Sequence, residues 1–223
     1  LEAHLDETVR ELTRLLQAER YEPRPVTRVW IDKLGSNEKR PLGIPTVRDR
    51  VVQTALAYVL EPIFERDFAE HSYGFRPGRN AQQAIARVET LLAQGQVWVV
   101  DADLKGYFDS IPQDKLLQAV AHKVADGRIL RLLEAYLQQG VLESAKDWQP
   151  TPHGTPQGAV ISPLLANLYL DPLDHRMAGQ GRGMIRYADD FIILCRSQAE
   201  AQAALAEVAA WVQEAGLVLH PSK

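Results

Sequence analysis

Residues 97–112 read VWVVDADLKGYFDSIP, and residues 184–195 read MIRYADDFIILC. Both stretches place aspartates beside runs of β-branched and apolar residues, which are typical of strands. In the first, Asp101 and Asp103 would share one face of a strand, because side chains alternate across an extended chain. In the second, the runs MIRY and FIIL predict a hairpin with Asp189 at its turn. Together they predict adjacent strands that bring carboxylates to one end of a sheet.

Two carboxylates on one face of an apolar strand need a partner, because burying an unpaired charge is costly. A divalent cation with oxygen ligands would neutralise them. Alternatively, the strand end is exposed, and Asp101 and Asp103 pair with Arg or Lys. A turn aspartate by itself is ordinary turn chemistry. The combination of Asp103 with Asp189 on a neighbouring turn favours the cation site.

The rest of the chain mixes helical and extended patterns, which predicts an α+β fold. A hairpin is expected over residues 25–45, with its tip near Gly35, because prolines, β-branched residues and turn formers dominate there. Helices are expected at 4–19, at 47–64 with a break near Pro62, at 80–95, at 113–139 as a pair, at 163–173 and at 197–216.

Composition limits the class of protein. Of the 223 residues, 46% are hydrophobic and 24% are charged, which is ordinary for a globular protein. No run of about 18 uncharged apolar residues is present, so a membrane-spanning helix is not expected. Residues 1–20 lack the pattern of a secretory signal, and we expect a cytoplasmic protein without a membrane partner. The single cysteine, Cys195, excludes an internal disulfide and is expected to be buried in a strand.

The net charge of −4 argues mildly against nucleic-acid binding, but the charges are unevenly distributed. Between residues 20 and 50, eight basic residues stand against four acidic ones, and Arg66, Arg76 and Arg79 follow. A basic region combined with a carboxylate cluster suits a polyanion that is handled through metal ions. A solvated basic surface is the alternative.

Several blocks resemble, in order, the motifs of reverse transcriptases encoded by group II introns. They are RPLGIPTVRDRVVQTAL (40–56), EPIFERDFAEHSYGFRPGRNAQQAI (61–85), VVDADLKGYFDSIP (99–112), GTPQGAVISPLLANLYLDPLD (154–174), YADD (187–190) and LVLHPSK (217–223). The resemblance covers the chain from about residue 20 to its end. Ordered blocks of this kind are far more specific than YADD alone.

The resemblance implies an α+β polymerase right-hand fold, with a palm of antiparallel sheet backed by helices and a fingers subdomain. Residues 1–96 would be mainly fingers and residues 97–223 mainly palm, with 112–153 packing partly with the fingers. The thumb of such enzymes would be absent from this chain. A chain without it would polymerise weakly.

The implied activity is RNA-directed DNA synthesis, in which dNTPs extend a DNA or RNA primer on an RNA template. Asp103 and Asp189 would bind two Mg²⁺ ions, for which Mn²⁺ can substitute. Asp190 would be an auxiliary carboxylate, and the backbone carbonyl of Leu104 a further ligand. The protein's main task would then be positioning and charge stabilisation.

The resemblance also implies nucleotide contacts. Lys33 and Arg40 would contact the phosphates of the incoming nucleotide, and Gln157 the nucleotide itself. Phe108 would act as a steric gate against a ribose 2′-hydroxyl. Lys223 would protonate the leaving pyrophosphate. The plainer alternatives are a solvated basic hairpin for Lys33 and Arg40, and a core aromatic for Phe108.

Arg76 and Arg79, within FRPGR, would hold template or nucleotide phosphates, or else form a surface cluster. The parent would be a prokaryotic intron-encoded protein or a recruited relative such as a CRISPR-associated enzyme. Its partners would then be intron RNA or CRISPR adaptation proteins. The other classes considered are a catalytically silent RNA-binding polymerase fold, an RNA-dependent RNA polymerase and a metal-dependent phosphodiesterase. Phe108 and Ala188 argue against the RNA polymerase, whose turn usually carries GDD.

Overall fold

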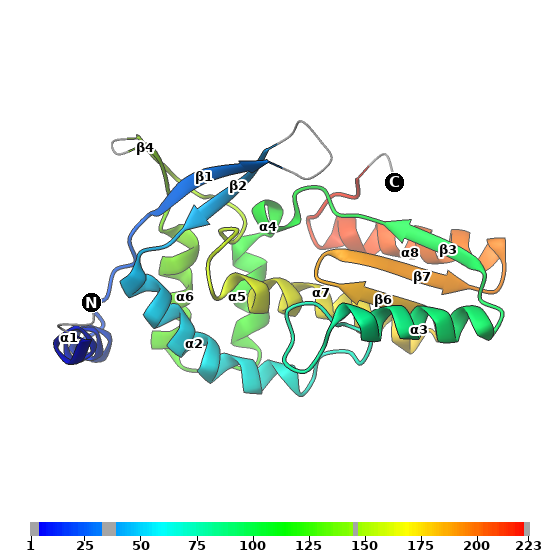
Figure 1. The fold of residues 1–223 in the computed structure, drawn as a ribbon, viewed down its shortest axis with the longest axis horizontal. Coiled ribbons are helices and arrows are strands. Elements are labelled where there is room, and N and C mark those ends of the chain that lie inside the picture. The colour runs from blue at the N-terminus through cyan, green and yellow to red at the C-terminus, as the bar shows by residue number, and fades with distance from the viewer. Residues whose placement is uncertain (1–4, 33–38, 145–146, 221–223) are drawn as a thin grey trace. The chain divides into compact units, whose positions relative to one another are not determined.

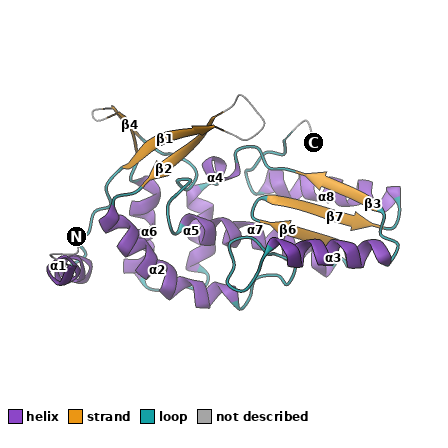
Figure 2. Ribbon diagram, in the orientation of Figure 1, coloured by secondary structure: helices purple, strands orange, loops and turns teal. Residues whose placement is uncertain are grey.

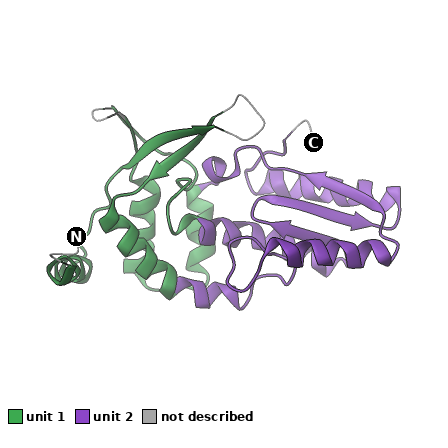
Figure 3. Cartoon of the chain, viewed as in Figure 1, with its two compact units in different colours: residues 1–59, 113–162 green, residues 60–112, 163–223 purple. Residues whose placement is uncertain are grey.

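The computed structural model describes residues 5–32, 39–144 and 147–220, and the chain forms two compact units. Unit 1 comprises Leu1–Val59 and Gln113–Ser162, and unit 2 comprises Leu60–Pro112 and Pro163–Lys223 (Figure 3). Each unit is assembled from two separate stretches of chain. Motifs that are distant in the sequence therefore meet within each unit.

Unit 1 contains a four-stranded sheet in the order β2-β1-β4-β5. Its strands are β1 (Val26–Asp32), β2 (Lys39–Ile44), β4 (Val141–Ser144) and β5 (Asp147–Gln149). β1 pairs antiparallel with β2 and parallel with β4, which confirms the paired strands of the hairpin predicted over 25–45; its predicted tip near Gly35 lies outside the described residues. The helices are α1 (Leu5–Gln17), most of α2 (Val47–Glu65), α5 (Gln113–Ala121) and α6 (Gly127–Gln138). The sequence does not predict β4 and β5, because strands this short show no clear alternation.

Unit 2 contains a three-stranded antiparallel sheet in the order β3-β7-β6 (Figure 1). Its strands are β3 (Trp98–Ala102), β6 (Gly183–Tyr187) and β7 (Asp190–Cys195). The predicted pairing of the strand at 97–104 with the hairpin at 184–195 is therefore confirmed. The helices are α3 (Ala81–Ala93), the short α4 (Tyr107–Ser110), α7 (Ser162–Gly179) and α8 (Gln198–Glu214).

Helices α3 and α8 both pack on this sheet (Figure 2). α3 begins at a capping box, in which Asn80 and Gln83 each accept a hydrogen bond from the backbone N–H of the other. Its Leu91 is buried in a cluster with Ile185 of β6 and Leu194 of β7. α8 packs against β3 and β7. The sheet is thereby held as a rigid support for the residues at its ends.

Two prolines do not end their helices. α2 runs through Pro62 to Glu65, so the predicted break there is wrong, and α7 runs through Pro172 to Gly179. Phe64 and Met177, which follow these prolines, are 3% and 0% exposed, so core packing outweighs the lost backbone hydrogen bond. Although α2 and α7 have 19 and 18 residues, no helix in the described part of the chain is apolar and long enough to cross a membrane.

The two units are not consecutive along the chain, whereas the predicted fingers (1–96) and palm (97–223) are, and that assignment remains a prediction. Residues 60–96 belong to unit 2, because α3 packs on β6 and β7. Residues 113–162 belong to unit 1, and they include most of the stretch 112–153 that was expected to pack partly with the fingers. The division follows packing on the two sheets rather than chain order.

Candidate active site

The acidic residues of the two motifs meet at one end of the β3-β7-β6 sheet. The antiparallel register pairs Ala102 with Phe191. The chain that leaves β3 at Asp103 therefore reaches the level of the turn between β6 and β7. Asp189 lies in that turn, and Asp190 is the first residue of β7. The sheet thus brings the three predicted carboxylates to the same end of unit 2.

β3 is an edge strand with one open face. Val100 and Ala102 are buried, whereas Val99 is 51% exposed and Asp101 is also exposed. The predicted alternation is present, but the carboxylate face is not buried. Asp101 therefore needs no cation to offset desolvation, and the prediction that both carboxylates of this face require a partner is wrong for Asp101. Asp103, at the end of the strand, is half-buried and remains the stronger candidate ligand.

The donors at this sheet end are suited to a hard cation. Within residues 5–32, 39–144 and 147–220, no group of three or more His, Cys, Asp or Glu side chains could hold a metal ion. The carboxylates of Asp103 and Asp189, together with backbone carbonyls such as that of Leu104, offer oxygen atoms instead. Mg²⁺ is commonly bound by one or two carboxylates together with substrate phosphates. The residues therefore fit a cation shared with a phosphate-bearing substrate, and not a closed protein cage.

Tyr107 connects this sheet end to α7. It is buried, and its hydroxyl donates to the carbonyl of Ala166 at 2.6 Å. Burial raises the pKa of Tyr107 well above its ordinary value; the charge of Arg186 opposes this rise and the charge of Asp189 adds to it. The hydroxyl therefore stays protonated, and the Asp189 carboxylate lies within electrostatic reach of it.

The predicted steric gate, Phe108, lies in α4 and is half-buried. Its ring meets Tyr107 and Phe75 edge-on, with centroid separations of 5.6 and 6.3 Å. Tyr107 is the core aromatic of this pair, whereas Phe108 keeps part of its ring accessible. Phe75, which sequence reasoning missed, is 55% exposed and adopts a φ of 58°. A left-handed phenylalanine is uncommon and marks a constrained loop, but no sequence signal reveals it.

Arg40 and Gln157 lie on two segments of unit 1 that contact each other through their backbones. Arg40 is an exposed residue of β2. The carbonyl of Gln157 accepts a hydrogen bond from the N–H of Gly43, in the same strand, at 2.7 Å. Gly158 has a φ of 97°, and a Cβ there would lie 2.8 Å from the carbonyl oxygen of Gly43. Glycine at this position therefore lets the PQG loop (residues 156–158) lie directly against β2.

The structure corrects the expectation for Arg76. Its side chain is only 3% exposed and pairs with Glu65 at 2.8 Å. It also donates to the carbonyls of Ala69 and Ser72, at 2.7 and 2.8 Å. With its donors used in this way, Arg76 holds the loop together and is not available to a phosphate. The sequence suggests a surface arginine because FRPGR looks like a loop, and it does not show that the loop folds around this side chain.

The other predicted basic contacts have different outcomes. Arg79 is half-buried, donates to the carbonyl of Glu70 at 2.9 Å and lies 5.7 Å above the ring of Tyr73. It remains a candidate, because one hydrogen bond leaves further N–H groups on the guanidinium. Lys33 and Lys223 lie outside the described residues.

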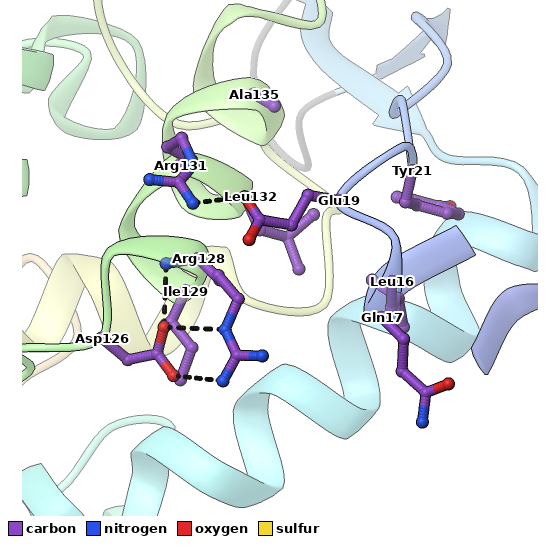
Figure 4. A pocket seen from close by; sticks show the side chains of 10 residues that line it. All are labelled: Leu16, Gln17, Glu19, Tyr21, Asp126, Arg128, Ile129, Arg131, Leu132 and Ala135. Atoms are coloured by element: carbon purple, nitrogen blue, oxygen red, sulfur yellow. Dashed lines mark hydrogen bonds and ion pairs between the residues drawn. The ribbon is translucent and has the colours of Figure 1, made fainter. Parts of the chain in front are cut away.

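Of two pockets in the described part of the chain, one contains a predicted site residue and the other does not. A pocket of about 470 Å³ in unit 1 is lined by residues of α1, α6 and the segments beside them (Figure 4). Arg131 and Arg128, on its wall, pair with Glu19 and Asp126, so their charges are neutralised. It contains none of the predicted site residues. A smaller pocket of about 260 Å³ in unit 2 is lined by β3, α8 and Asp103.

Sequence comparison agrees with this geometry. The profile of the family described as reverse transcriptase (RNA-dependent DNA polymerase) matches residues 31–223. Group II intron-encoded protein LtrA of Lactococcus lactis subsp. cremoris is 39% identical over 171 residues, covering 76% of this chain and 28% of LtrA. Protein YkfC of Escherichia coli (strain K12) is 34% identical, covering 98% of this chain and 67% of YkfC. The chain thus spans little more than a quarter of LtrA.

Solved structures extend the comparison to the fold. A chain of a Cas6-RT-Cas1–Cas2 complex has a TM-score of 0.51 at 28% identity, covering 94% of this chain and 36% of that chain. Telomerase from Candida albicans, solved with a fragment of telomeric RNA, has a TM-score of 0.68 at 12% identity, covering 93% of this chain and 43% of that chain. The second likeness concerns the fold alone. Together they confirm the α+β right-hand polymerase fold, with antiparallel sheet and helices, predicted from the sequence.

Proposed function

The chain belongs to the reverse transcriptase family, and we propose that it is an RNA-directed DNA polymerase of the group II intron-like branch. It would add dNTPs to the 3′-hydroxyl of a DNA or RNA primer on an RNA template. The observation that carries the proposal is the arrangement of unit 2, where Asp103 leaves β3 beside the turn that holds Asp189. A protein that only binds RNA has no need of this acidic sheet end.

Asp103 and Asp189 would hold two Mg²⁺ ions, or Mn²⁺ in their place, with Asp190 and the carbonyl of Leu104 as auxiliary ligands. When bound, such a pair of ions lowers the pKa of the attacking hydroxyl and stabilises the leaving pyrophosphate. The contribution of the protein is to hold its carboxylates on a packed sheet, so that little reorganisation is needed during the reaction.

Arg40 and Gln157 would contact the nucleotide. Arg40 would bind the triphosphate, because a guanidinium offers a planar fork of donors that matches phosphate oxygens. Gln157 would contact the nucleotide from the PQG loop, whose backbone is fixed on β2 by the hydrogen bond from Gly43. Lys33 would contact the nucleotide phosphates, and Lys223 would protonate the leaving pyrophosphate.

Phe108 would select dNTPs over rNTPs. Its ring is braced by Tyr107 on one side and Phe75 on another, so it cannot easily move away from an added hydroxyl. Arg79 would contact template or nucleotide phosphates, which position nucleic acid without reading its sequence.

The relatives point to two biological settings. LtrA is encoded by a group II intron, and the structural neighbour is part of a complex with Cas1 and Cas2. Intron RNA or CRISPR adaptation proteins are therefore the partners to test first. Reading the DNA next to the gene for an intron or a CRISPR array separates the two.

Primer extension tests the proposal. The protein is incubated with Mg²⁺, a labelled DNA primer annealed to RNA, and either dNTPs or rNTPs, with LtrA as positive control. We expect extension with dNTPs, little with rNTPs and none after addition of EDTA. Efficient extension with rNTPs would indicate an RNA polymerase. No extension where LtrA extends would contradict the proposal.

A further inference from the structure

Arg186, in β6, is a fully buried cation beside the catalytic turn of unit 2. Its side chain is 1% exposed, and that of its partner Asp174, in α7, is 5% exposed. Arg186 Nε donates to both carboxylate oxygens of Asp174 at 2.9 Å. A buried ion pair is weak evidence for stability, because desolvation offsets much of the attraction. Stability alone therefore does not account for this pair, and Arg186 has further hydrogen-bond partners.

The remaining branch of the guanidinium reaches the turn itself. Its NH1 group donates to the carbonyl of Ala188 at 2.7 Å and to Asn167 Oδ1 at 2.8 Å. Ala188 immediately precedes Asp189 and adopts a φ of 60°, which an alanine rarely does without support. Arg186 thus ties a left-handed peptide, one residue before the candidate metal ligand, to the rigid helix α7.

The same turn is held from a second side. Asn167 Nδ2 donates to the carbonyl of Gly74 at 2.8 Å. A Cβ at Gly74 would lie 2.2 Å from the backbone nitrogen of Ala188, so the two backbones are in direct contact. Segment 71–74 also exchanges backbone hydrogen bonds with Arg186. The turn is therefore enclosed by a network whose centre is one guanidinium.

We propose that Arg186 is a positioning residue, which sets the direction of the Asp189 carboxylate through the Ala188 carbonyl. The inference rests on the proposed polymerase function, in which Asp189 binds metal. A ligand that is already held in one orientation loses little freedom when the ion binds. Outer hydrogen-bond partners of metal ligands commonly change metal affinity or activity by about 10- to 100-fold when they are removed.

The test needs a variant that folds without the network. Arg186→Met alone would leave Asp174 buried and unpaired, which is strongly destabilising. The double variant Arg186→Met/Asp174→Leu replaces the ion pair with apolar side chains of similar size, a change that proteins often tolerate. Arg186→Lys is the second variant: it keeps the charge beside Asp174 but lacks the branched head that also reaches Ala188.

Arg76 provides a matched control within the same unit. It is also buried, pairs with one carboxylate and donates to backbone carbonyls, including that of Ser72 in segment 71–74, but it does not donate to Ala188. The double variant Arg76→Met/Glu65→Leu therefore removes a buried arginine and its carboxylate partner but leaves the hydrogen bond from Arg186 to the Ala188 carbonyl in place. Any general effect of losing a buried ion pair appears in both variants.

Two readouts are compared with the melting temperature of each variant. The first is Mn²⁺ binding, followed by electron paramagnetic resonance and restricted to the sites lost in Asp189→Asn. The second is the Mg²⁺ concentration that gives half-maximal primer extension. We expect Arg186→Met/Asp174→Leu to weaken Mn²⁺ binding by about 10- to 100-fold and to raise the Mg²⁺ requirement by a similar factor. If that variant does not fold, the same changes are expected of Arg186→Lys.

The control variant should stay within about twofold of the unsubstituted protein in both readouts, even where its melting temperature falls as far. Equal metal binding in the Arg186 and Arg76 variants would overturn the inference, as would absence of Mn²⁺ sites that depend on Asp189. A protein that binds Mn²⁺ through Asp189 but extends no primer would refute the polymerase proposal alone. The binding readout would still decide the role of Arg186.

Discussion

The hairpins β1–β2 and β6–β7 are both antiparallel and rich in β-branched residues, but they expose these residues differently. In β1, Trp30 and Ile31 are 51% and 45% exposed. In the other hairpin, Ile185 and Ile193 are 4% and 0% exposed, because α3 and α8 pack on that sheet. A buried hairpin can hold a carboxylate in a fixed place, whereas an exposed one presents side chains such as Arg40 to a ligand. The same motif would therefore support a fixed carboxylate in unit 2 and present ligand-binding side chains in unit 1.

The largest expected effect is the loss of primer extension when Asp189, in the β6–β7 turn, is replaced. Asp189→Asn keeps the size of the side chain but removes the charge that hard divalent ions need. We expect primer extension to fall by several orders of magnitude, since the two-metal chemistry would lose a ligand. RNA affinity, measured by titration at fixed salt, should persist because basic residues supply most phosphate contacts. Robust extension by the Asn variant would defeat the assignment, and loss of RNA binding as well would indicate a structural role.

The second prediction tests burial directly with one substitution in each hairpin. Ile193→Ala should lower the free energy of unfolding by about 2–5 kcal/mol, because it leaves a cavity in the packed sheet. Ile31→Ala, on the exposed strand, should change it by less than about 0.5 kcal/mol. Urea denaturation of both variants measures the difference. Equal losses would mean that β1–β2 is covered in solution and that the contrast between the hairpins is wrong.

These two hairpins also show how far the sequence alone reaches. Alternation and apolar runs predict both hairpins and the pairing of the β3 strand with β6–β7, and helical spacing predicts the helix at 80–95 that the structure shows as α3. These sequence patterns do not show which of the two hairpins is buried by helices. Burial depends on α3 and α8, whose placement is set by tertiary packing rather than by local pattern.

The candidate site divides in the same way. Asp103 and Asp189 can be chosen from the local strand and turn patterns, whereas Phe108 can be chosen only through the family resemblance, because the sequence does not predict the short helix α4. The different partners of Arg76 and Arg186 cannot be predicted in this way, since both arginines lie next to motif residues in the sequence. Only the fold shows that each of them is buried, and that Arg186, unlike Arg76, donates directly to the Asp189 turn at the Ala188 carbonyl.

The third prediction concerns sugar selection in unit 2. Phe108→Ala should raise incorporation of rNTPs relative to dNTPs by about 5- to 150-fold, the range expected when a steric penalty of about 1–3 kcal/mol is removed. Single-nucleotide extension with each substrate gives the ratio. Phe108→Tyr, which keeps the ring, is the control and should retain most of the discrimination. An unchanged ratio in the Ala variant would remove Phe108 as the gate.

The smallest effect is expected on the exposed hairpin of unit 1. Arg40 and Lys39 are neighbours at the start of β2, both exposed, and their side chains project to opposite faces because strand residues alternate. Arg40→Ala should raise the KM for dNTPs by about tenfold, the loss expected for a charged hydrogen bond worth about 1.5 kcal/mol. Lys39→Ala makes the same change in net charge and should leave this KM within about twofold. The stability of both variants should match that of the unsubstituted protein, since neither side chain is packed. Equal increases in KM would mean that the hairpin acts through its overall charge. A larger increase for Lys39→Ala would show that the other face of β2 meets the nucleotide.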